Sequence, residues 1–216
     1  MNEHGAEPVR GLPESLPEGE TLLWQGGPQW GVLARRGFHL RELAIYFAFL
    51  IAWYVATVAT AGAAWQEAAI GIARVAGLTL AALGLVAAFA WLVCRTTVYT
   101  ITNRRLVMRF GVAFPMTLNL PFRSIESAGL RAFAAGAGDI PVSLLPECKV
   151  AYLYLWPHAR PWRMSRPQPM LRAVPDAARV AQVLARGLAA SAEQPARPVA
   201  EPVAGGGPRV RATAAA

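Results

Sequence analysis

The strongest pattern in the chain is a pair of long apolar runs in its first half. The first, LAIYFAFLIAWYVATVATAG, covers residues 43–62, and the second, VAGLTLAALGLVAAFAWLVC, covers residues 75–94; neither contains a charged side chain. Each has about the 20 residues that a helix needs to cross the hydrocarbon core of a bilayer. The short link 63–74 separates them, so the pattern predicts two transmembrane helices joined as a tight hairpin.

Arginines at the outer ends of the two runs predict how the hairpin is oriented. The flanks carry Arg35, Arg36 and Arg41 before the first run and Arg95, Arg104, Arg105 and Arg109 after the second, whereas the link carries Arg74 alone. Flanks rich in Lys and Arg remain cytoplasmic during insertion, so both termini are expected on the cytoplasmic side. We expect most of these arginines, together with His39, to contact the membrane surface or a partner.

After the second run the pattern changes to the two-residue alternation of β-strands. Alternating β-branched, aromatic and polar residues, punctuated by Gly and Pro, predict strands at 96–102, 105–110, 117–122, 125–133 and 149–156. The run ETLLWQ at 20–25 predicts one more strand, which pairs with a later one. Asn103 and Arg104 separate two of the strands and predict a hairpin turn, so the sheet is expected to be antiparallel.

One amphipathic helix is predicted near the end of the chain. Asp176 precedes a segment in which Val180, Val183, Leu184 and Leu188 lie on one face at helical spacing. Its apolar face is expected to close the sheet. Beyond Glu193 the chain is rich in Pro, Ala, Gly and Arg without periodicity.

The fold class is therefore an α+β membrane protein: a two-helix transmembrane hairpin and a β-rich domain closed by a C-terminal helix. The expected organisation is a flexible leader (1–19), a strand and interfacial segment (20–42), the hairpin (43–94), a cytoplasmic domain (95–190) and a disordered tail (191–216). The leader has no basic n-region followed by an apolar stretch, so no cleavable signal is expected.

Composition agrees with residence in a membrane. The chain has 216 residues, of which 55% are hydrophobic and 16% charged, and its net charge of +8 comes almost wholly from arginine. Such a charge suits nucleic acid, anionic lipid or topology signals. Because no nucleic-acid motif occurs and the arginines flank the apolar runs, a nucleic-acid partner is not expected. Cys94 and Cys148 are far apart and are expected to be unpaired thiols.

Ionisable residues do not gather into a catalytic or metal-binding pattern, so no enzyme activity and no cofactor is expected. His39 could ligate a metal, but a hydrogen bond at the interface is the more common role. The acids Glu126, Asp139 and Glu147 are interpreted as solvated surface, and Gly136 and Gly138 as part of a plain turn. An arginine-rich segment either forms a contact patch or is a solvated loop; it contains Trp156, Arg160, Trp162, Arg163, Arg166 and Arg172.

Residues 99–127, YTITNRRLVMRFGVAFPMTLNLPFRSIES, resemble the core signature of bacterial pleckstrin-homology-like domains on membrane proteins. The signature positions are Thr102, Asn103, Arg105, Leu106, Arg109, Gly111, Leu120, Pro121 and Ile125. The wider order of features resembles the PuhB family of photosynthetic complex assembly proteins of purple bacteria. It begins with LPEGETLLWQG at 16–26 and continues with the motif RxFHxRELAIYF at 36–47. The likeness covers about residues 12–190.

This resemblance implies a non-enzymatic role in assembling the photosynthetic reaction centre and its light-harvesting antenna in the inner (intracytoplasmic) membrane. The implied partners are reaction-centre and antenna polypeptides, with membrane lipids around the hairpin. Small residues in the second run, such as Gly77, Ala81 and Gly84, leave a homo-oligomer open.

Two rival functions are weighed against this role. One is a lipid- or protein-binding module of another pathway, in which Arg104, Arg105 and Arg109 grip anionic headgroups. The other is an accessory subunit of a membrane enzyme or transporter. The uncharged apolar runs argue against transport, because transport pathways usually need polar groups at the midplane of the membrane.

Overall fold

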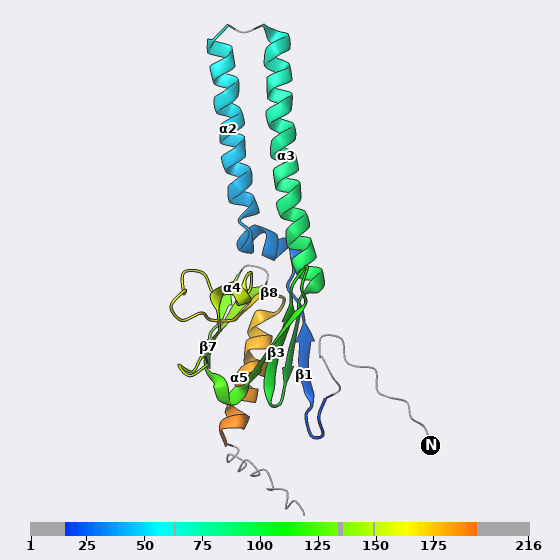
Figure 1. The fold of residues 1–216 in the computed structure, drawn as a ribbon, viewed down its shortest axis with the longest axis vertical. Helices are drawn as coiled ribbons and strands as arrows, with labels where there is room; N and C mark the ends of the chain where they lie inside the picture. Colours follow the sequence, from blue (N-terminus) through cyan, green and yellow to red (C-terminus); the bar gives the residue numbers. More distant parts are fainter. Residues whose placement is uncertain (1–15, 63, 134–135, 149, 194–216) are drawn as a thin grey trace, which may run out of the picture.

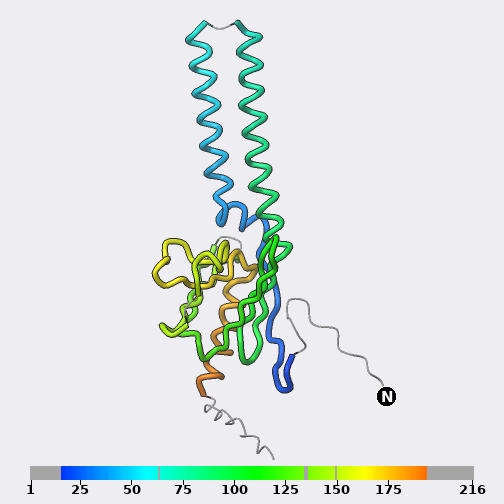
Figure 2. The backbone as a smooth tube through the Cα atoms, viewed as in Figure 1, coloured from blue at the N-terminus to red at the C-terminus, as the bar shows by residue number. Residues whose placement is uncertain are grey.

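Two long helices dominate the shape of the molecule (Figures 1 and 2). The computed structural model describes residues 16–62, 64–133, 136–148 and 150–193. Helix α2 (Leu40–Thr60) and helix α3 (Trp65–Thr96) run side by side away from an α+β domain, and both are long and apolar enough to span a membrane. Their unlinked ends both meet the domain, so the residues before α2 and after α3 lie at the same end of the pair.

Helix α3 is longer than the sequence predicts. It begins at Trp65, so most of the predicted link 63–74 is helical. The reason is that this stretch is rich in Ala, a strong helix former, and that Glu67 lies in the first turn, where the helix dipole favours a negative charge. At Gly71 an added Cβ would collide with the hydroxyl of Tyr54, so this glycine lets α2 approach α3 closely. Gly77 and Gly84 face open space instead.

The first sheet contains a strand from each side of the helix pair. Its strands are β1 (Leu22–Gly26), β2 (Val98–Thr102), β3 (Arg105–Phe110) and β4 (Met116–Pro121), antiparallel and in that order. The predicted hairpin at 96–110 is confirmed, with Val98 opposite Arg109. Strand β1 pairs with β2 although the whole helix pair separates them in sequence. The domain therefore includes β1 and does not begin at residue 95.

The second sheet is built around a strand that the sequence does not predict. Strand β7 (Gly138–Leu144) pairs antiparallel with β5 (Ile125–Ala128), β6 (Arg131–Ala132) and β8 (Met170–Val174). The predicted strand at 125–133 is thus two strands. The predicted strand at 149–156 is wrong, because Tyr152–Leu155 forms the one-turn helix α4. Its alternating residues pair with no strand in the described part of the chain, and tertiary context overrides the local pattern.

Helix α5 (Ala177–Glu193) closes the domain core as predicted. Val180 and Leu184 are fully buried against the sheets, and Val183 and Leu188 pack at the edge of the same cluster. Gly187 lets the helix contact the ring of Phe122, since a Cβ at this position would lie 2.8 Å from it. The predicted leader and tail lie mainly outside the described residues.

A second, smaller core fastens the helix pair to the domain. The chain passes from β1 through α1 (Trp30–Val32) and the π-helical turn η1 (Leu33–Gly37) into α2. Leu33 of η1 is buried with Val93 of α3 and Ala173 of β8. The Trp30 indole N–H donates to the carbonyl of Ala87 at 3.2 Å. The last turns of α3 are therefore part of the domain.

Candidate functional site

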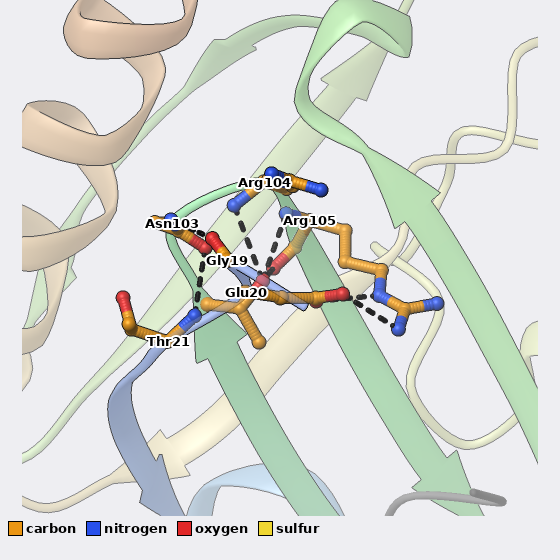
Figure 3. A network of polar contacts seen from close by, with 7 residues as sticks. Gly19, Glu20, Thr21, Asn103, Arg104 and Arg105 are labelled. Atoms are coloured by element: carbon orange, nitrogen blue, oxygen red, sulfur yellow. Dashed lines mark hydrogen bonds and ion pairs between the residues drawn. The ribbon is translucent and has the colours of Figure 1, made fainter. Parts of the chain in front are cut away.

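The residues of the signature hairpin hold the N-terminal strand in place (Figure 3). The Asn103 side chain accepts a hydrogen bond from the Thr21 N–H and donates one to the Gly19 carbonyl, both at 3.0 Å. The Arg105 guanidinium donates to Glu20 through Nε at 2.7 Å and through Nη2 at 2.9 Å. The signature residues therefore attach residues 19–21, which precede the helix pair in sequence, to the turn between β2 and β3, which follows it.

The Glu20 carboxylate is almost completely buried, with its side chain 3% exposed. Burial raises the pKa of Glu20, but the hydrogen bonds from Arg105 and Thr102 and the charges of Arg105 and Arg104 outweigh burial and leave it lowered. Arg105 is thus bound within the fold. With Arg104 it lies at the turn between β2 and β3, a strand length of roughly 16 Å from the end of α3.

The predicted contact residues are therefore divided among three places. Arg104 and Arg105 lie at the end of the sheet far from the helices. Arg109 lies near Arg95 at the base of α3, beside a shallow hollow closed by the turn after Gly111. The other four, Arg35, Arg36, His39 and Arg41, lie around the first turn of α2 and line connected hollows there. This last group is brought together with three further arginines, Arg131, Arg160 and Arg172.

A cavity of about 640 Å³ lies between the first turn of α2 and the second sheet. We call it the arginine cavity, because its lining includes Arg35, Arg36, Arg131, Arg160 and Arg172. These side chains come from η1, β6, the loop before β8 and β8 itself. The Gln29 N–H, just before α1, donates a hydrogen bond of 2.8 Å to the Ala173 carbonyl of β8, and Leu33 of η1 packs in the same small core as Ala173.

These guanidinium groups lie over an aromatic ring or donate hydrogen bonds to neutral oxygen atoms. Arg36 and Arg131 both lie over the ring of Phe133, at 5.5 and 5.8 Å from its centroid. Arg172 donates to the Pro157 carbonyl at 3.0 Å, and Arg160 donates to the Gln168 side chain at 2.9 Å. Arg35 Nε donates to the Gly31 carbonyl at 2.9 Å. Each guanidinium has five N–H donors, so the hydrogen bonds found among the described residues use only a few of them.

Two acidic side chains, Glu42 and Asp139, also line the arginine cavity. Glu42 forms an ion pair with Arg41 at 3.6 Å, and its carboxylate lies 3.9 Å from His39 Nδ1. Asp139 is buried and accepts a hydrogen bond from the Ala173 N–H at 2.8 Å, so its interpretation as a solvated acid is wrong. Burial raises the pKa of Asp139 despite this hydrogen bond and the nearby charges of Arg172 and Arg131.

A series of hydrogen bonds between buried polar side chains leads to Arg172 in the lining of the cavity. The Tyr99 hydroxyl accepts a hydrogen bond from the Arg172 N–H at 3.1 Å and shares another with His158 Nδ1 at 2.9 Å. His158 Nε2 shares a hydrogen bond with the Thr97 hydroxyl at 3.1 Å, so both ring nitrogens have a partner. Burial lowers the pKa of His158 to about 3, with a further contribution from the charge of Arg172. This series of hydrogen bonds links the end of α3 to β8.

The chain matches the family model described as Bacterial PH domain over residues 40–188, which include both long helices, both sheets except β1, and most of α5. The chain belongs to the bacterial PH domain family. It is also 37% identical, over 92% of its own length and 93% of the relative, to an uncharacterized 23.7 kDa protein in the puhA 5′ region of Rhodobacter capsulatus. No solved structure matches it.

The arginine-rich loop of this bacterial PH domain is partly fixed and partly exposed. Trp162 is 93% exposed at the mouth of the arginine cavity. On the other side of the loop, Arg163 and Arg166 border a groove of about 760 Å³ beside β5 and β7, with Ser127 and Ser143 opposite. The loop therefore contributes basic side chains to two neighbouring hollows.

Sequence reasoning did not find three of the residues that shape the arginine cavity. Arg131 and Phe133 belong to a segment predicted as one continuous strand, and Asp139 stands in a glycine-rich stretch predicted as a turn. None of the three belongs to a recognisable sequence motif. They come close to Arg36 only in the folded domain, where β6 pairs with β7. Within the described part of the chain, no three His, Cys, Asp or Glu side chains gather where they could hold a metal ion.

Proposed function

We propose that this bacterial PH domain protein crosses the bacterial inner (intracytoplasmic) membrane twice, with both termini cytoplasmic. In this proposal it acts without catalysis as an assembly factor for the photosynthetic reaction centre and its antenna. Reaction-centre and antenna polypeptides are its proposed partners. The observation that carries the membrane part is the exposed apolar surface of α2 and α3.

Water is an unsuitable solvent for that surface. Large apolar side chains stand 61–73% exposed along both helices: Ile45, Phe49, Trp53, Leu78, Leu80 and Leu85. No residue of α2 is buried. A soluble protein rarely exposes such a continuous apolar surface, whereas acyl chains of a bilayer would cover it at no cost.

Helix lengths match this arrangement. The 21 residues of α2 rise roughly 31 Å, close to the thickness of the hydrocarbon core, and the 32 residues of α3 rise roughly 48 Å. The excess of α3 is its last part, which packs on the domain. Aromatic side chains suited to the membrane interface lie at this level, among them Trp30, Trp91 and Trp156, each about half exposed.

The sign of the flanking charges supports the proposed orientation. The domain end of the helix pair carries Arg35, Arg36, Arg41 and Arg95. Among the described residues of the link region, the charged side chains are Glu67, in the first turn of α3, and Arg74, roughly 14 Å further along the same helix than Trp65. Cytoplasmic flanks retain such arginines. The pairing of β1 with β2 also requires both ends of the hairpin to be on the same side of the bilayer.

Two observations support the assembly role. The sequence resembles the PuhB family, and the relative in Rhodobacter capsulatus is described by its position in the puhA 5′ region. The fold suits a scaffold: a rigid domain is fixed at the end of two helices whose apolar faces could pack against other spans.

Deletion of the gene in its own host tests the assembly role. Absorption spectra of isolated membranes and quantitation of reaction-centre and antenna polypeptides should show loss of these complexes with normal pigment synthesis. A plasmid copy of the gene should restore them. Unchanged spectra and polypeptide levels would contradict the assembly role and favour a membrane-anchored lipid- or protein-binding module of another pathway.

A further inference from the structure

We infer that the arginine cavity binds the phosphate group of an anionic membrane phospholipid. This inference rests on the proposed insertion of α2 and α3 into a bilayer, and it deepens that proposal by naming a ligand. The site differs from the arginines of the signature hairpin, because Arg105 is already paired with Glu20 and lies at the far end of the sheet.

Charge in the cavity is not balanced by the protein. Five arginines line it against two acids. The only arginine–carboxylate ion pairs among the described residues are those of Glu42 with Arg41 and of Glu20 with Arg105, so none of the five has a carboxylate at ion-pairing distance. Asp139 accepts a hydrogen bond from the Ala173 N–H and interacts electrostatically with Arg172 and Arg131, but two acids offset only two of the five arginines. An anion is the ligand that this excess of positive charge favours.

Convergence of the arginines from distant segments suggests a binding site rather than a solvated cluster. Arg36 of η1 and Arg131 of β6 lie over the same ring of Phe133, which holds two like charges near each other. Arg172 is only partly exposed and is positioned by the Pro157 carbonyl. The repulsion among these guanidinium groups would fall when a phosphate oxygen accepts their hydrogen bonds.

The location of the arginine cavity favours a lipid as the source of the phosphate. The cavity borders the first turn of α2, so it lies at headgroup level when α2 crosses the membrane. The exposed apolar side chains of α2, such as Ile45 and Phe49, begin directly beyond it and could contact the acyl chains of the same lipid. The exposed Trp162 at the mouth suits the interface. A free phosphate ion would use none of these apolar contacts.

Lipid titrations of the full-length protein in maltoside micelles, followed by native mass spectrometry, test this inference. Phosphatidylglycerol and phosphatidylcholine with identical acyl chains serve as the anionic and the zwitterionic probe, and inorganic phosphate serves as the soluble probe. The test variant combines Arg36→Gln with Arg131→Gln, two exposed positions. The control combines Arg104→Gln with Arg123→Gln, which removes the same charge at the far end of the sheet. Thermal unfolding confirms that both variants fold.

The wild type and the control should bind phosphatidylglycerol in preference to phosphatidylcholine. The cavity variant should bind phosphatidylglycerol roughly tenfold to a hundredfold more weakly, because hydrogen bonds to a charged group are lost. Inorganic phosphate in millimolar excess should not displace the lipid. Equal weakening in both variants, or no preference in the wild type, would overturn the site. Full displacement by phosphate would overturn the lipid assignment.

Failure of this site and failure of the proposed function give different results. A protein without lipid preference could still be required for the photosynthetic complexes, and the deletion strain would show this. Normal complexes in the deletion strain would overturn the assembly role but would leave the lipid titration unchanged.

Discussion

The Glu20 carboxylate accepts hydrogen bonds from Nε and Nη2 of Arg105 at 2.7 and 2.9 Å, across the edge of the first sheet. This pair joins the segment before the helix pair to the turn between β2 and β3 (Figure 3). The helix pair is therefore inserted between β1 and β2, two paired strands that are also joined at the end of the sheet far from the helices.

Replacing Glu20 by Gln should lower the free energy of unfolding of the domain by about 1.5–3 kcal/mol at pH 7, because charged hydrogen bonds are lost at a buried position. The pKa of Glu20 is lowered in the folded protein, so the contribution is present above its unfolded pKa of 4.5 and is lost as the pH falls below that value. Urea titrations in detergent micelles measure both effects. The control Glu126→Gln, at an exposed position, should change neither; equal losses in the two variants would contradict the role of the pair.

The His158 side chain should make the domain less stable in mild acid. Its folded pKa of about 3 is below the unfolded value of 6.5, so its contribution is full above pH 6.5 and is lost as the pH falls towards 3. In this window the free energy of unfolding should fall by about 1.4 kcal/mol per pH unit. His158→Gln should be less stable at pH 7 but should lose this slope between pH 6.5 and 5. An unchanged slope would show that another group titrates.

Asp139 offers a test that separates a hydrogen bond from a charge. The pKa of Asp139 in the folded protein is raised above its unfolded value of 3.8. The free energy of unfolding should therefore fall as the pH rises above 3.8 and the side chain ionises. Asp139→Asn retains an acceptor for the Ala173 N–H and should keep the free energy of unfolding at pH 7 within about 1 kcal/mol of the wild type. Asp139→Ala leaves that buried N–H unpaired and should cost about 1–3 kcal/mol. Equal losses in the two variants would mean that the negative charge is required.

Gly111 of the signature is required by the turn after β3. Its φ is 119°, and a Cβ added there would collide with the Phe114 carbonyl. Gly111→Ala should therefore destabilise the domain by about 1–3 kcal/mol. Gly84 in α3 has open space around it, so Gly84→Ala serves as the control and should cost nothing. Thermal unfolding in micelles compares them, and a neutral Gly111→Ala would contradict the strain.

The helices and the first sheet could be predicted from the sequence because their patterns are local. The apolar runs at 43–62 and 75–94 and the alternation in 98–110 require no knowledge of partners. Strand β7 contains Gly138, Asp139 and Pro141, which are typical of loops, and it is a strand because three other strands pair with it. The segment 150–156 shows the opposite case, since its alternating residues pair with no described strand and Tyr152–Leu155 is helical.

The candidate site could be predicted only in part, for the same reason. Arg35, Arg36, His39 and Arg41 were expected to act together because they are close in sequence, and the structure places them around one turn. In the sequence, Arg160 and Arg172 stand out only as part of an arginine-rich segment, either a contact patch or a solvated loop, and Arg131 does not stand out. The pairing of β6, β7 and β8 brings Arg131 and Arg172 to the same cavity, and the loop before β8 adds Arg160. Arg104 and Arg105 are next to the second helix in sequence, but the strand between carries them to the opposite end of the sheet.

The placement of two single cysteines relative to the bilayer tests the central claim most directly. Cys148 is exposed on the domain, and Ala64 lies at the turn between α2 and α3. One variant keeps only Cys148 (Cys94→Ser), and the other adds Ala64→Cys after both native cysteines are replaced by Ser. In intact spheroplasts a membrane-impermeant maleimide should label the cysteine at position 64 and should reach Cys148 only after permeabilisation. Labelling of Cys148 in intact cells, or release of the protein from membranes by alkaline carbonate, would contradict a two-pass protein with a cytoplasmic domain.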